Sequence, residues 1–403
     1  MVDNVDLNDL EDFDDLDDID EVLNPQRAAQ KNGGVKRPRR LKSPIRAKEE
    51  SFAQTAEAGE STPVESAPAP SSPAPSAPAP EQSVQSAKSA QRLDRGSDEY
   101  LAAHPRISSV IASAVLSVLG LLASASVFYV GVWTLTGQYF DSWMWSQMAQ
   151  IYPSFERYVP VIFTDSHWII GVSVGMIVAA FAFAIARKRF WTAGTMIVFM
   201  IVAFGSSFIL KRVLPRPVLD SFIPDPANSA PSGHTAFTMI AGVLLVMAVP
   251  RVLRALTTLW AMIFSTAVGV MVIYDGWHRP TDALTAILLV GALGLLAMAF
   301  TRASGMDEPG TRKSSISVQI TSTVLIVAGL CASAYGTYIV SQLYSLVQYR
   351  PEALAVSGVQ ATLALILGQS AAVFGCLLAV RHATAAPLTR QGVMGAPPVP
   401  PRQ

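Results

Sequence analysis

Long apolar runs occupy the chain from about residue 108 onward, and short polar segments separate them. A helix needs roughly 20 apolar residues to cross a hydrocarbon layer about 30 Å thick. The pattern predicts eight membrane-spanning helices, at residues 108–135, 168–186, 191–210, 235–250, 255–275, 281–301, 316–345 and 358–380. The predicted fold class is therefore an all-α, polytopic membrane protein, because helices satisfy their backbone hydrogen bonds internally in lipid.

The residues before the first apolar run have a different character. Residues 1–21 hold eleven Asp or Glu, residues 27–48 hold nine Lys or Arg, and residues 61–80 are almost entirely Ser, Pro and Ala. Such segments cannot bury enough apolar surface to fold alone, so we predict a disordered tail over residues 1–105. Its acidic start either keeps the terminus soluble or binds a protein partner. Its basic stretch either fixes topology or contacts anionic lipid headgroups.

Composition supports a membrane protein and excludes a basic nucleic-acid binder. Hydrophobic residues make up 51% of the chain, charged residues 15%, and the formal net charge is zero. We expect four regions: the cytoplasmic tail of residues 1–105, a six-helix core over 106–302, two additional transmembrane helices over 303–383, and a disordered C-terminal tail over 384–403. The last two spans contain only mildly polar side chains, which favours a role in packing or partner contact.

Basic residues flanking the predicted spans set the expected orientation. Most of them fall on one side of the membrane: Arg95, Arg106, Arg187, Lys188, Arg189, Arg251, Arg254, Arg302, Arg312, Lys313, Arg381 and Arg390. Positively charged loops stay in the cytoplasm, so both termini are expected to be cytoplasmic in a multi-pass protein of the plasma membrane.

The opposite, extracytoplasmic side carries an exception to this rule. Basic residues crowd into loops there, and three segments meet on that side: 211–217, 228–234 and 274–282. Basic residues at a helix C-terminus could simply answer the helix dipole, at about 0.3 to 1 kcal/mol each. A bound phosphate group is the functional explanation for the same residues.

The residue types in these segments suit phosphate binding. Ser232 and Gly233 directly precede an apolar run, so their backbone N–H groups are expected at a helix N-terminus that attracts anions. Lys211 and Arg216 can supply positive charge, since the arginine fork matches two phosphate oxygens and lysine acts as a point charge.

Two of the five histidines, His234 and His278, stand beside these motif residues. One imidazole can attack phosphorus while the other protonates the leaving oxygen. Asp282 follows His278 by four residues, and Pro280 is suited to start a helix, so the carboxylate is expected to reach the imidazole. It would set the imidazole tautomer.

These residues resemble the signatures of the type 2 phosphatidic acid phosphatase family. Pro231-Ser232-Gly233-His234 matches the central signature, and His278 with Asp282 matches the His-x-x-x-Asp of the third. The resemblance covers roughly residues 108–301. It implies a six-helix core and an outward-facing site that works without a metal ion or another cofactor.

The resemblance also implies roles for the matching residues. His278 would be the nucleophile that forms a phosphohistidine, Asp282 its orienting partner, and His234 the general acid. Ligands of the phosphoryl oxygens would be Lys211, Arg216, Ser232 and the Gly233 amide.

The chain departs from the family pattern at two places. Four residues separate Lys211 from Arg216, fewer than in the family's first signature. Met271 and Val272 stand where the third signature carries Ser-Arg. Two other arginines are candidates for the missing charge: Arg279, which adjoins the nucleophile, and Arg212, at the end of the preceding span.

The expected activity is hydrolysis of a lipid phosphate at the extracytoplasmic face. The expected substrate is a polyprenyl phosphate or diphosphate, a polyprenyl-phosphosugar, or a glycerophospholipid phosphate. The alternative is a catalytically impaired relative that acts as a lipid-binding or scaffolding membrane protein. A transporter is disfavoured, because the spans show no clear paired charges or broken helices at mid-membrane.

Overall fold

The computed structural model describes residues 105–219, 227–302, 305–307, 316–346 and 351–386. All of them belong to the compact unit of residues 77–403. Almost all of the two predicted tails lies outside the described residues. This includes the acidic stretch, for which partner binding was one of two alternatives.

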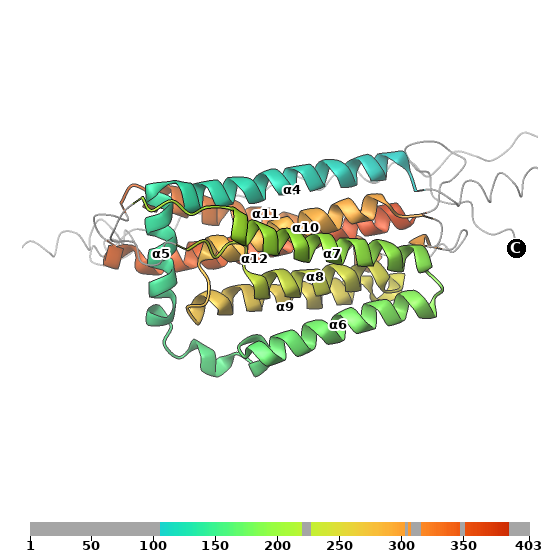
Figure 1. Ribbon diagram of the computed structural model, residues 1–403, viewed down its shortest axis with the longest axis horizontal. Coiled ribbons are helices and arrows are strands. Elements are labelled where there is room, and N and C mark those ends of the chain that lie inside the picture. The colour runs from blue at the N-terminus through green and yellow to red at the C-terminus, as the bar shows by residue number, and fades with distance from the viewer. Residues whose placement is uncertain (1–104, 220–226, 303–304, 308–315, 347–350, 387–403) are drawn as a thin grey trace, which may run out of the picture. The chain divides into compact units, whose positions relative to one another are not determined.

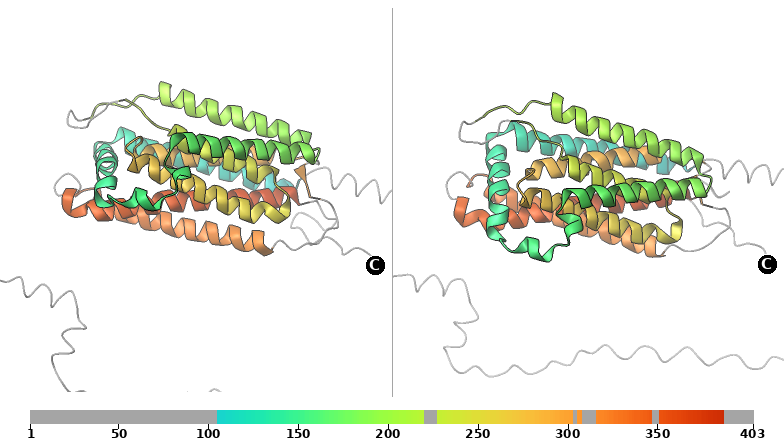
Figure 2. Two further views of the ribbon diagram at one scale, coloured as in Figure 1. Left: turned by 90° about the horizontal axis from the view of Figure 1, so that it is seen from below. Right: turned by 60° about the horizontal axis from the view of Figure 1, so that its bottom comes forward.

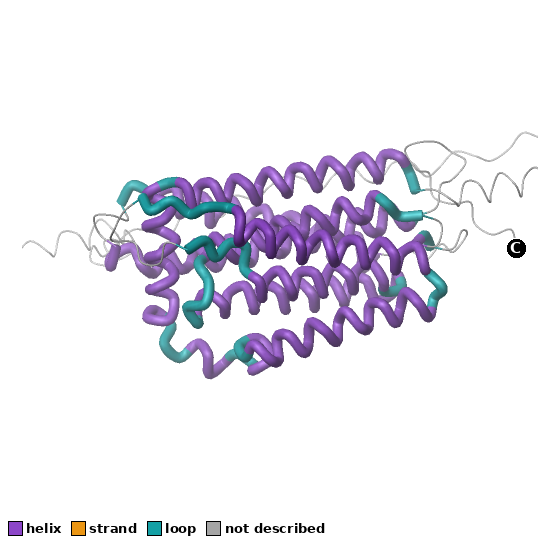
Figure 3. Tube along the Cα trace, viewed as in Figure 1, coloured by secondary structure: helices purple, strands orange, loops and turns teal. Residues whose placement is uncertain are grey.

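Helices make up the described fold, and no strand occurs in those ranges (Figure 3). The long helices are α4 (Ile107–Trp133), α5 (Leu135–Ile151), α6 (Ser166–Ala186), α7 (Phe190–Val213), α8 (Gly233–Ala248), α9 (Arg254–Tyr274), α10 (Pro280–Ala299), α11 (Ile316–Leu343) and α12 (Pro351–Ala385). Short 3-10 turns lie at η1 (Phe155–Tyr158), η2 (Val161–Phe163) and η3 (Arg251–Leu253). The predicted all-α class is confirmed.

Every predicted apolar run forms a helix, but the runs differ in length. Seven helices of the described part are long and apolar enough to cross a membrane. The remaining predicted span, α8, has 16 residues, and at 1.5 Å per residue it is about 24 Å long. These helices make the chain a multi-pass membrane protein.

Helices α8 and α10 form the centre of the bundle. Almost every residue of both helices is buried. Helix α10 packs against α4, α8 and α12, while α6 and α7 cover α8 (Figures 1 and 2). At Gly131 of α4, any side chain would collide with Thr281 in the first turn of α10. The two helices can therefore approach closely where α10 begins.

Helix α5 is an element that the sequence analysis did not predict. It runs across one end of the bundle, nearly at right angles to the other long helices (Figures 1 and 2). Thr134 caps its N-terminus by accepting a hydrogen bond from the Gly137 N–H. Phe140, Met144 and Met148 recur at helical spacing and form its buried face. We call this part of the bundle the α5 end.

Helices α11 and α12 pack differently against the rest of the bundle. Helix α12 packs into the core against α9 and α10, whereas α11 packs chiefly on α12. Small residues let these two helices approach closely, as at Gly329, where an added side chain would meet the backbone of Ala372. Packing is one of the two roles that the sequence predicted for these spans, and small residues are common where membrane helices pack closely.

Candidate active site

Two connections meet at the α5 end of the bundle, one joining α7 to α8 and the other joining α9 to α10 (Figure 3). They are tied together by the backbone, since the Ser232 N–H donates to the Asp282 carbonyl at 2.9 Å. Helix α5 closes over the second connection, where Trp145 Nε1 donates to the Gly276 carbonyl at 2.8 Å. Residues far apart in the chain are thereby brought to one place.

The predicted His278–Asp282 pair is formed. Pro280 begins α10, and Asp282 lies in its first turn. His278 Nδ1 lies 3.1 Å from Asp282 Oδ2, the distance of a hydrogen bond. The Arg279 N–H donates to the same oxygen at 3.1 Å. A carboxylate at Nδ1 favours the tautomer that carries its proton there, which leaves the Nε2 lone pair available as a nucleophile.

Ser229 belongs to this network, although the sequence analysis gave it no role. Its hydroxyl donates to Asp282 Oδ2 at 2.6 Å. Arg279 Nη1 in turn donates to Ser229 Oγ at 3.2 Å. Ser229 therefore couples the loop before α8 to the carboxylate of α10. Its place two residues before the Pro-Ser-Gly-His motif was the available sequence signal.

His234, the second residue of α8, makes contacts with two other segments. Its Nε2 lies 2.9 Å from the hydroxyl of Ser166, the first residue of α6. Its ring centroid is 5.2 Å from that of Trp277, the neighbour of His278. Both histidines therefore lie at the junction of the two connections. Ser166 has no sequence signal of its own, because it is 68 residues away from His234.

The N-terminus of α8 is built as the sequence predicts. Ser232 is its N-cap, and its hydroxyl accepts a hydrogen bond from the Thr235 N–H at 3.4 Å. Gly233 follows, and no atom lies within 4 Å of the position where a side chain would begin. The backbone of the first turn thus faces unfilled space. An anion can approach the N–H groups there without meeting a side chain.

Arg216 is anchored by an acidic residue that the sequence analysis missed. Its Nη1 lies 3.8 Å from Asp141 Oδ2 of α5, and both side chains are almost fully buried. Asp141 Oδ1 also accepts the Thr281 N–H at 2.8 Å. The pKa of Asp141 is raised to about 7, chiefly because burial disfavours the charged form and secondarily because Asp282 lies nearby. Asp141 joins the arginine to the start of α10.

The remaining predicted cations differ in their exposure and in their distance from the histidine–aspartate pair. Lys211 and Arg212 are exposed in the last turn of α7, and Arg212 Cζ lies 3.7 Å from the Phe208 ring centroid. Arg279 is buried and its Cζ lies 5.3 Å from the Trp145 ring. Val272, at the position of the signature arginine, is fully buried inside α9. Of the two arginines considered as replacements, Arg279 is the one that touches the histidine–aspartate network.

Comparison with protein families confirms the resemblance seen in the motifs. Residues 189–306 match the family model of the PAP2 superfamily. This segment is similar to the PAP2 superfamily. It runs from the start of α7 past the end of α10 and contains every site residue that the sequence predicted. Comparison with curated proteins and with solved structures gave no match.

The match indicates a general class of activity. PAP2 superfamily members are phosphatases, so the match supports a phosphoric ester hydrolase in general, in a chain with membrane-like helices. Asp141 and Ser166 lie before the matched segment. Two elements outside the PAP2 segment, α5 and α6, therefore contribute side chains to the site.

Proposed function

We propose that the protein is a lipid phosphate phosphatase that works through a phosphohistidine on His278. The observation that carries this proposal is the hydrogen bond between His278 Nδ1 and Asp282 Oδ2, at 3.1 Å. It directs the Nε2 lone pair away from the carboxylate. Nε2 makes no hydrogen bond within the described residues, so it remains available to attack phosphorus.

In the first step a bond forms between His278 Nε2 and phosphorus. The bond between phosphorus and the leaving oxygen breaks, and its electron pair stays on that oxygen. Protonated His234 donates a proton to it, so the product leaves as a lipid alcohol, or as a lipid monophosphate where the substrate is a diphosphate. The Ser166 hydroxyl at His234 Nε2 holds that ring in place during the transfer.

In the second step water attacks the phosphohistidine. His234, now neutral, accepts a proton from the water while the new phosphorus–oxygen bond forms. The bond between phosphorus and Nε2 breaks, and inorganic phosphate leaves. Both histidines regain their starting protonation states, so the cycle closes without a further reactant.

Groups at the α5 end would stabilise the negative charge that builds on the phosphoryl oxygens. Arg216 offers a buried fork held by Asp141, and the first turn of α8 at Gly233 offers N–H groups beside open space. Lys211 contributes charge from the last turn of α7. We assign the role of the missing signature arginine to Arg279, because it bonds to Ser229 beside Asp282.

A lipid is the proposed substrate because the site lies at the end of membrane helices. A cavity of about 250 Å³ lies next to it, and we call it the α5 cavity. Its wall includes Asp141 and Thr281, side chains of α4, Val340 of α11, and Tyr344, which follows the end of α11. We place the substrate's hydrocarbon chain in this largely apolar space. The proposed substrate must carry a phosphate group on a long hydrocarbon chain. The candidates are a polyprenyl phosphate or diphosphate, a polyprenyl-phosphosugar and a glycerophospholipid phosphate.

We further propose that the site faces the outside of the cell. The basic residues at the other end of the helices outnumber those at the α5 end in the sequence. The positive-inside rule then assigns the α5 end to the extracytoplasmic face of the plasma membrane and both termini to the cytoplasm.

Phosphate release from a panel of prenyl and glycerolipid phosphates tests the proposal. Purified protein in detergent is compared with His278→Ala and with a matched control, His167→Ala, whose side chain is 95% exposed at the start of α6. We expect release by the wild type and the control and its loss in His278→Ala. Equal release by His278→Ala contradicts the mechanism. If the wild type releases no phosphate, the alternative is favoured, which is a catalytically impaired lipid-binding protein. The observation that supports this alternative is that Val272, at the position of the signature arginine, is buried and carries no charge.

A further inference from the structure

A second lipid-sized space lies in the other half of the bundle. A groove of about 430 Å³ runs between α7 and α10, and we call it the α7/α10 groove. Its walls are apolar and include Val198 and Val202 of α7 and Leu293 and Leu296 of α10. Gly194 lies in its floor, and nothing lies within 4 Å of the position where a side chain there would begin. The groove has the dimensions and polarity to hold a hydrocarbon chain.

The groove is remote from the candidate active site. Its first α10 residue is Leu293, whereas Asp282 of the site lies in the first turn of the same helix. Leu293 follows Asp282 by eleven positions, which is about 16 Å along a helix. On α7 the groove uses residues 190–202, while Lys211 is in the last turn. A chain in this groove therefore belongs to the leaflet opposite the α5 end.

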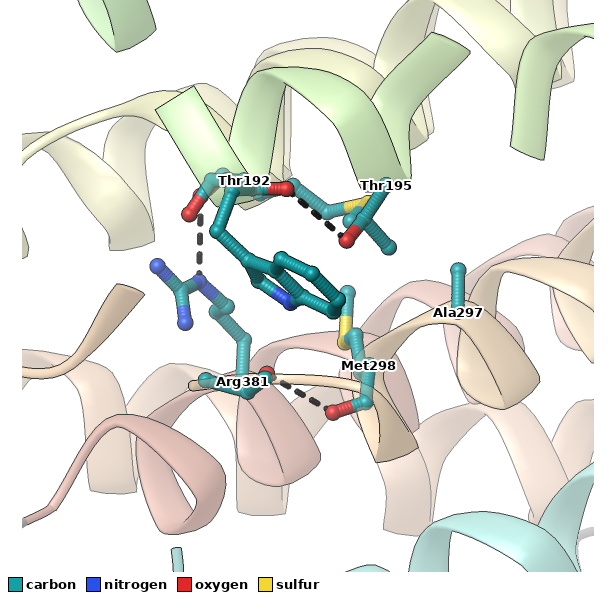
Figure 4. Close-up of a pocket in the computed structure, with 8 residues that line it drawn as sticks. Thr192, Thr195, Ala297, Met298 and Arg381 are labelled. Carbon is teal, nitrogen blue, oxygen red and sulfur yellow. Dashed lines mark hydrogen bonds between the residues drawn. The ribbon is translucent and has the colours of Figure 1, made fainter. Parts of the chain in front are cut away.

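A buried arginine lies where the groove ends. Trp191, Thr195 and Ala297 line both the groove and a small adjoining pocket. In Figure 4, Thr192 and Thr195 face Ala297 and Met298 across this pocket, and Arg381 reaches it from α12. The Arg381 side chain is almost completely buried. The groove thus adjoins a water-sized pocket of about 10 Å³ that has the Arg381 guanidinium in its wall.

Arg381 forms no ion pair or hydrogen bond with a carboxylate in the described part of the chain, although Asp307 acts on it electrostatically. Its Nε donates to the Met247 carbonyl at 3.1 Å and its Nη2 to the Gly305 carbonyl at 3.0 Å. Among the described residues no carboxylate lies at ion-pair distance from Arg381, and its Nη1 makes no hydrogen bond. A buried charge without a counterion in direct contact is costly, so a bound anion would stabilise this end of the bundle.

Asp307, the carboxylate that acts on Arg381, already binds another arginine. Asp307 accepts hydrogen bonds from Arg254 on both oxygens, at 2.8 and 3.0 Å. Burial opposes ionisation of Asp307, but the Arg254 guanidinium outweighs it and holds the pKa of that carboxyl below its usual value. Arg302 adds a further exposed cation, with Cζ 3.8 Å from the Trp191 ring centroid. Among the described residues, positive charge therefore exceeds negative charge around the pocket.

We propose that the α7/α10 groove and Arg381 form a binding site for an anionic glycerophospholipid of the leaflet opposite the candidate active site. One acyl chain lies in the groove between α7 and α10. The phosphodiester lies at its charged end, near Arg381 and Arg302. Trp191 stands between the two parts of the site, with the amphipathic ring that favours the headgroup level of a membrane. Basic pockets between membrane helices recognise anionic lipids in this way.

Native mass spectrometry of the full chain tests the site. Wild-type protein is equilibrated with equal amounts of phosphatidylglycerol and phosphatidylcholine, and the retained lipid is identified. We expect one phosphatidylglycerol to be kept with a preference of about fivefold or more, the effect of roughly one favourable charge contact. Gly194→Leu fills the groove floor and should lose the retained lipid. Arg381→Gln should keep a lipid but lose the preference for the anionic headgroup.

The matched control is Gly175→Leu on α6, because Gly175 is also an exposed helical glycine with nothing within 4 Å. It should retain phosphatidylglycerol as the wild type does. Three results would overturn the proposal: equal retention of the two lipids by the wild type, equal retention by the two glycine variants, and displacement of the lipid by inorganic phosphate alone. If the wild type were a dimer and Gly194→Leu a monomer, the groove would instead be the contact with a second copy of the chain. None of these readouts depends on catalysis.

Discussion

Both ends of the helix bundle gather charged side chains, but they balance the charge differently. At the α5 end, Asp282 binds His278 and Ser229, and Asp141 lies beside Arg216. At the opposite end, Arg254 takes both oxygens of Asp307, and Arg381 is left with backbone carbonyls. The first arrangement fixes a tautomer and aims a nucleophile. The second leaves a fixed positive charge, which is suited to holding an anion without transforming it.

The difference shows how one bundle can separate chemistry from anchoring. A histidine whose Nδ1 meets a carboxylate has its second nitrogen prepared for attack, so the α5 end has the parts of a reaction. The opposite end has cations and an apolar groove beside them. Variants at one end should therefore leave the measured property of the other end intact.

The largest effect is expected from Asp282→Asn. The amide would no longer favour the Nδ1–H tautomer of His278, so kcat should fall by about 10²-fold or more. The measurement is phosphate release at saturating lipid phosphate. Retention of phosphatidylglycerol should be unchanged, because the groove is at the other end. A loss of lipid retention together with kcat would mean that the variant disturbs the whole bundle.

The next effect is expected from Arg216→Lys. Lysine keeps the charge but loses the planar fork, and the guanidinium contact with Asp141 is altered. We expect kcat/KM to fall by roughly 10-fold to 100-fold, because a transition-state contact worth about 1.5 to 3 kcal/mol is weakened. Arg212→Lys, at the exposed arginine stacked on Phe208, is the matched control and should stay near the wild type. Equal losses in both variants would remove Arg216 from the phosphate site.

Asp141 gives a pH-dependent prediction. In the folded chain its pKa is raised from 3.8 to about 7. Protonated Asp141 therefore contributes its full share to the stability of the fold below about pH 4, and this contribution is lost as the pH rises to about 7. Relative to Asp141→Asn, the wild type should therefore lose thermal stability between pH 5 and 7 and show no further relative change up to pH 8. Thermal unfolding of both proteins in one detergent measures this. A flat difference between pH 5 and 8 would contradict the buried, uncharged form.

A smaller effect is expected in the α5 cavity. Val340→Trp on α11 should fill part of the cavity that we assign to the hydrocarbon chain. KM for long-chain lipid phosphates should rise a few-fold, while KM for short-chain ones should not, since about 0.8 kcal/mol is lost per methylene left unburied. Val327→Trp, on the lipid-exposed face of the same helix, is the control. Identical KM changes for both chain lengths would remove the cavity from the substrate site.

The smallest effect on phosphate release is expected from Gly194→Leu. Because the groove is remote from His278, release should stay within about twofold of the wild type, as for most surface changes of about 0.5 kcal/mol or less. The same preparation should have lost its retained lipid. A large loss of activity would show that the two ends communicate, which the comparison between them does not predict.

Sequence reasoning succeeded where the decisive contacts are local. His278 and Asp282 are four residues apart, so a proline-started helix is enough to predict their hydrogen bond. The cap at Ser232 and the open first turn at Gly233 also follow from neighbouring residues. The eight apolar runs gave the helices themselves for the same reason, since each helix is specified by its own stretch of chain.

Sequence reasoning missed residues whose role depends on tertiary contacts. Asp141 meets a backbone N–H that is 140 residues away, and Ser166 meets a histidine 68 residues away. Helix α5 was overlooked because it is too polar for a span. Its apolar and polar positions do alternate at helical spacing, so the sequence could have predicted an amphipathic surface helix. The elements against which this helix packs could not be predicted, because they are distant in the sequence.

Direct trapping of the phosphohistidine tests the central claim most sharply. Protein incubated with a lipid phosphate labelled with ³²P is quenched in alkali, in which phosphohistidine survives and phosphoserine is eliminated, and the labelled peptide is sequenced. The account predicts label on His278 in the wild type and more label in His234→Ala when a substrate with a good leaving group is used, because hydrolysis then lacks its base. Label on any other residue, or turnover without label in both proteins, would contradict it.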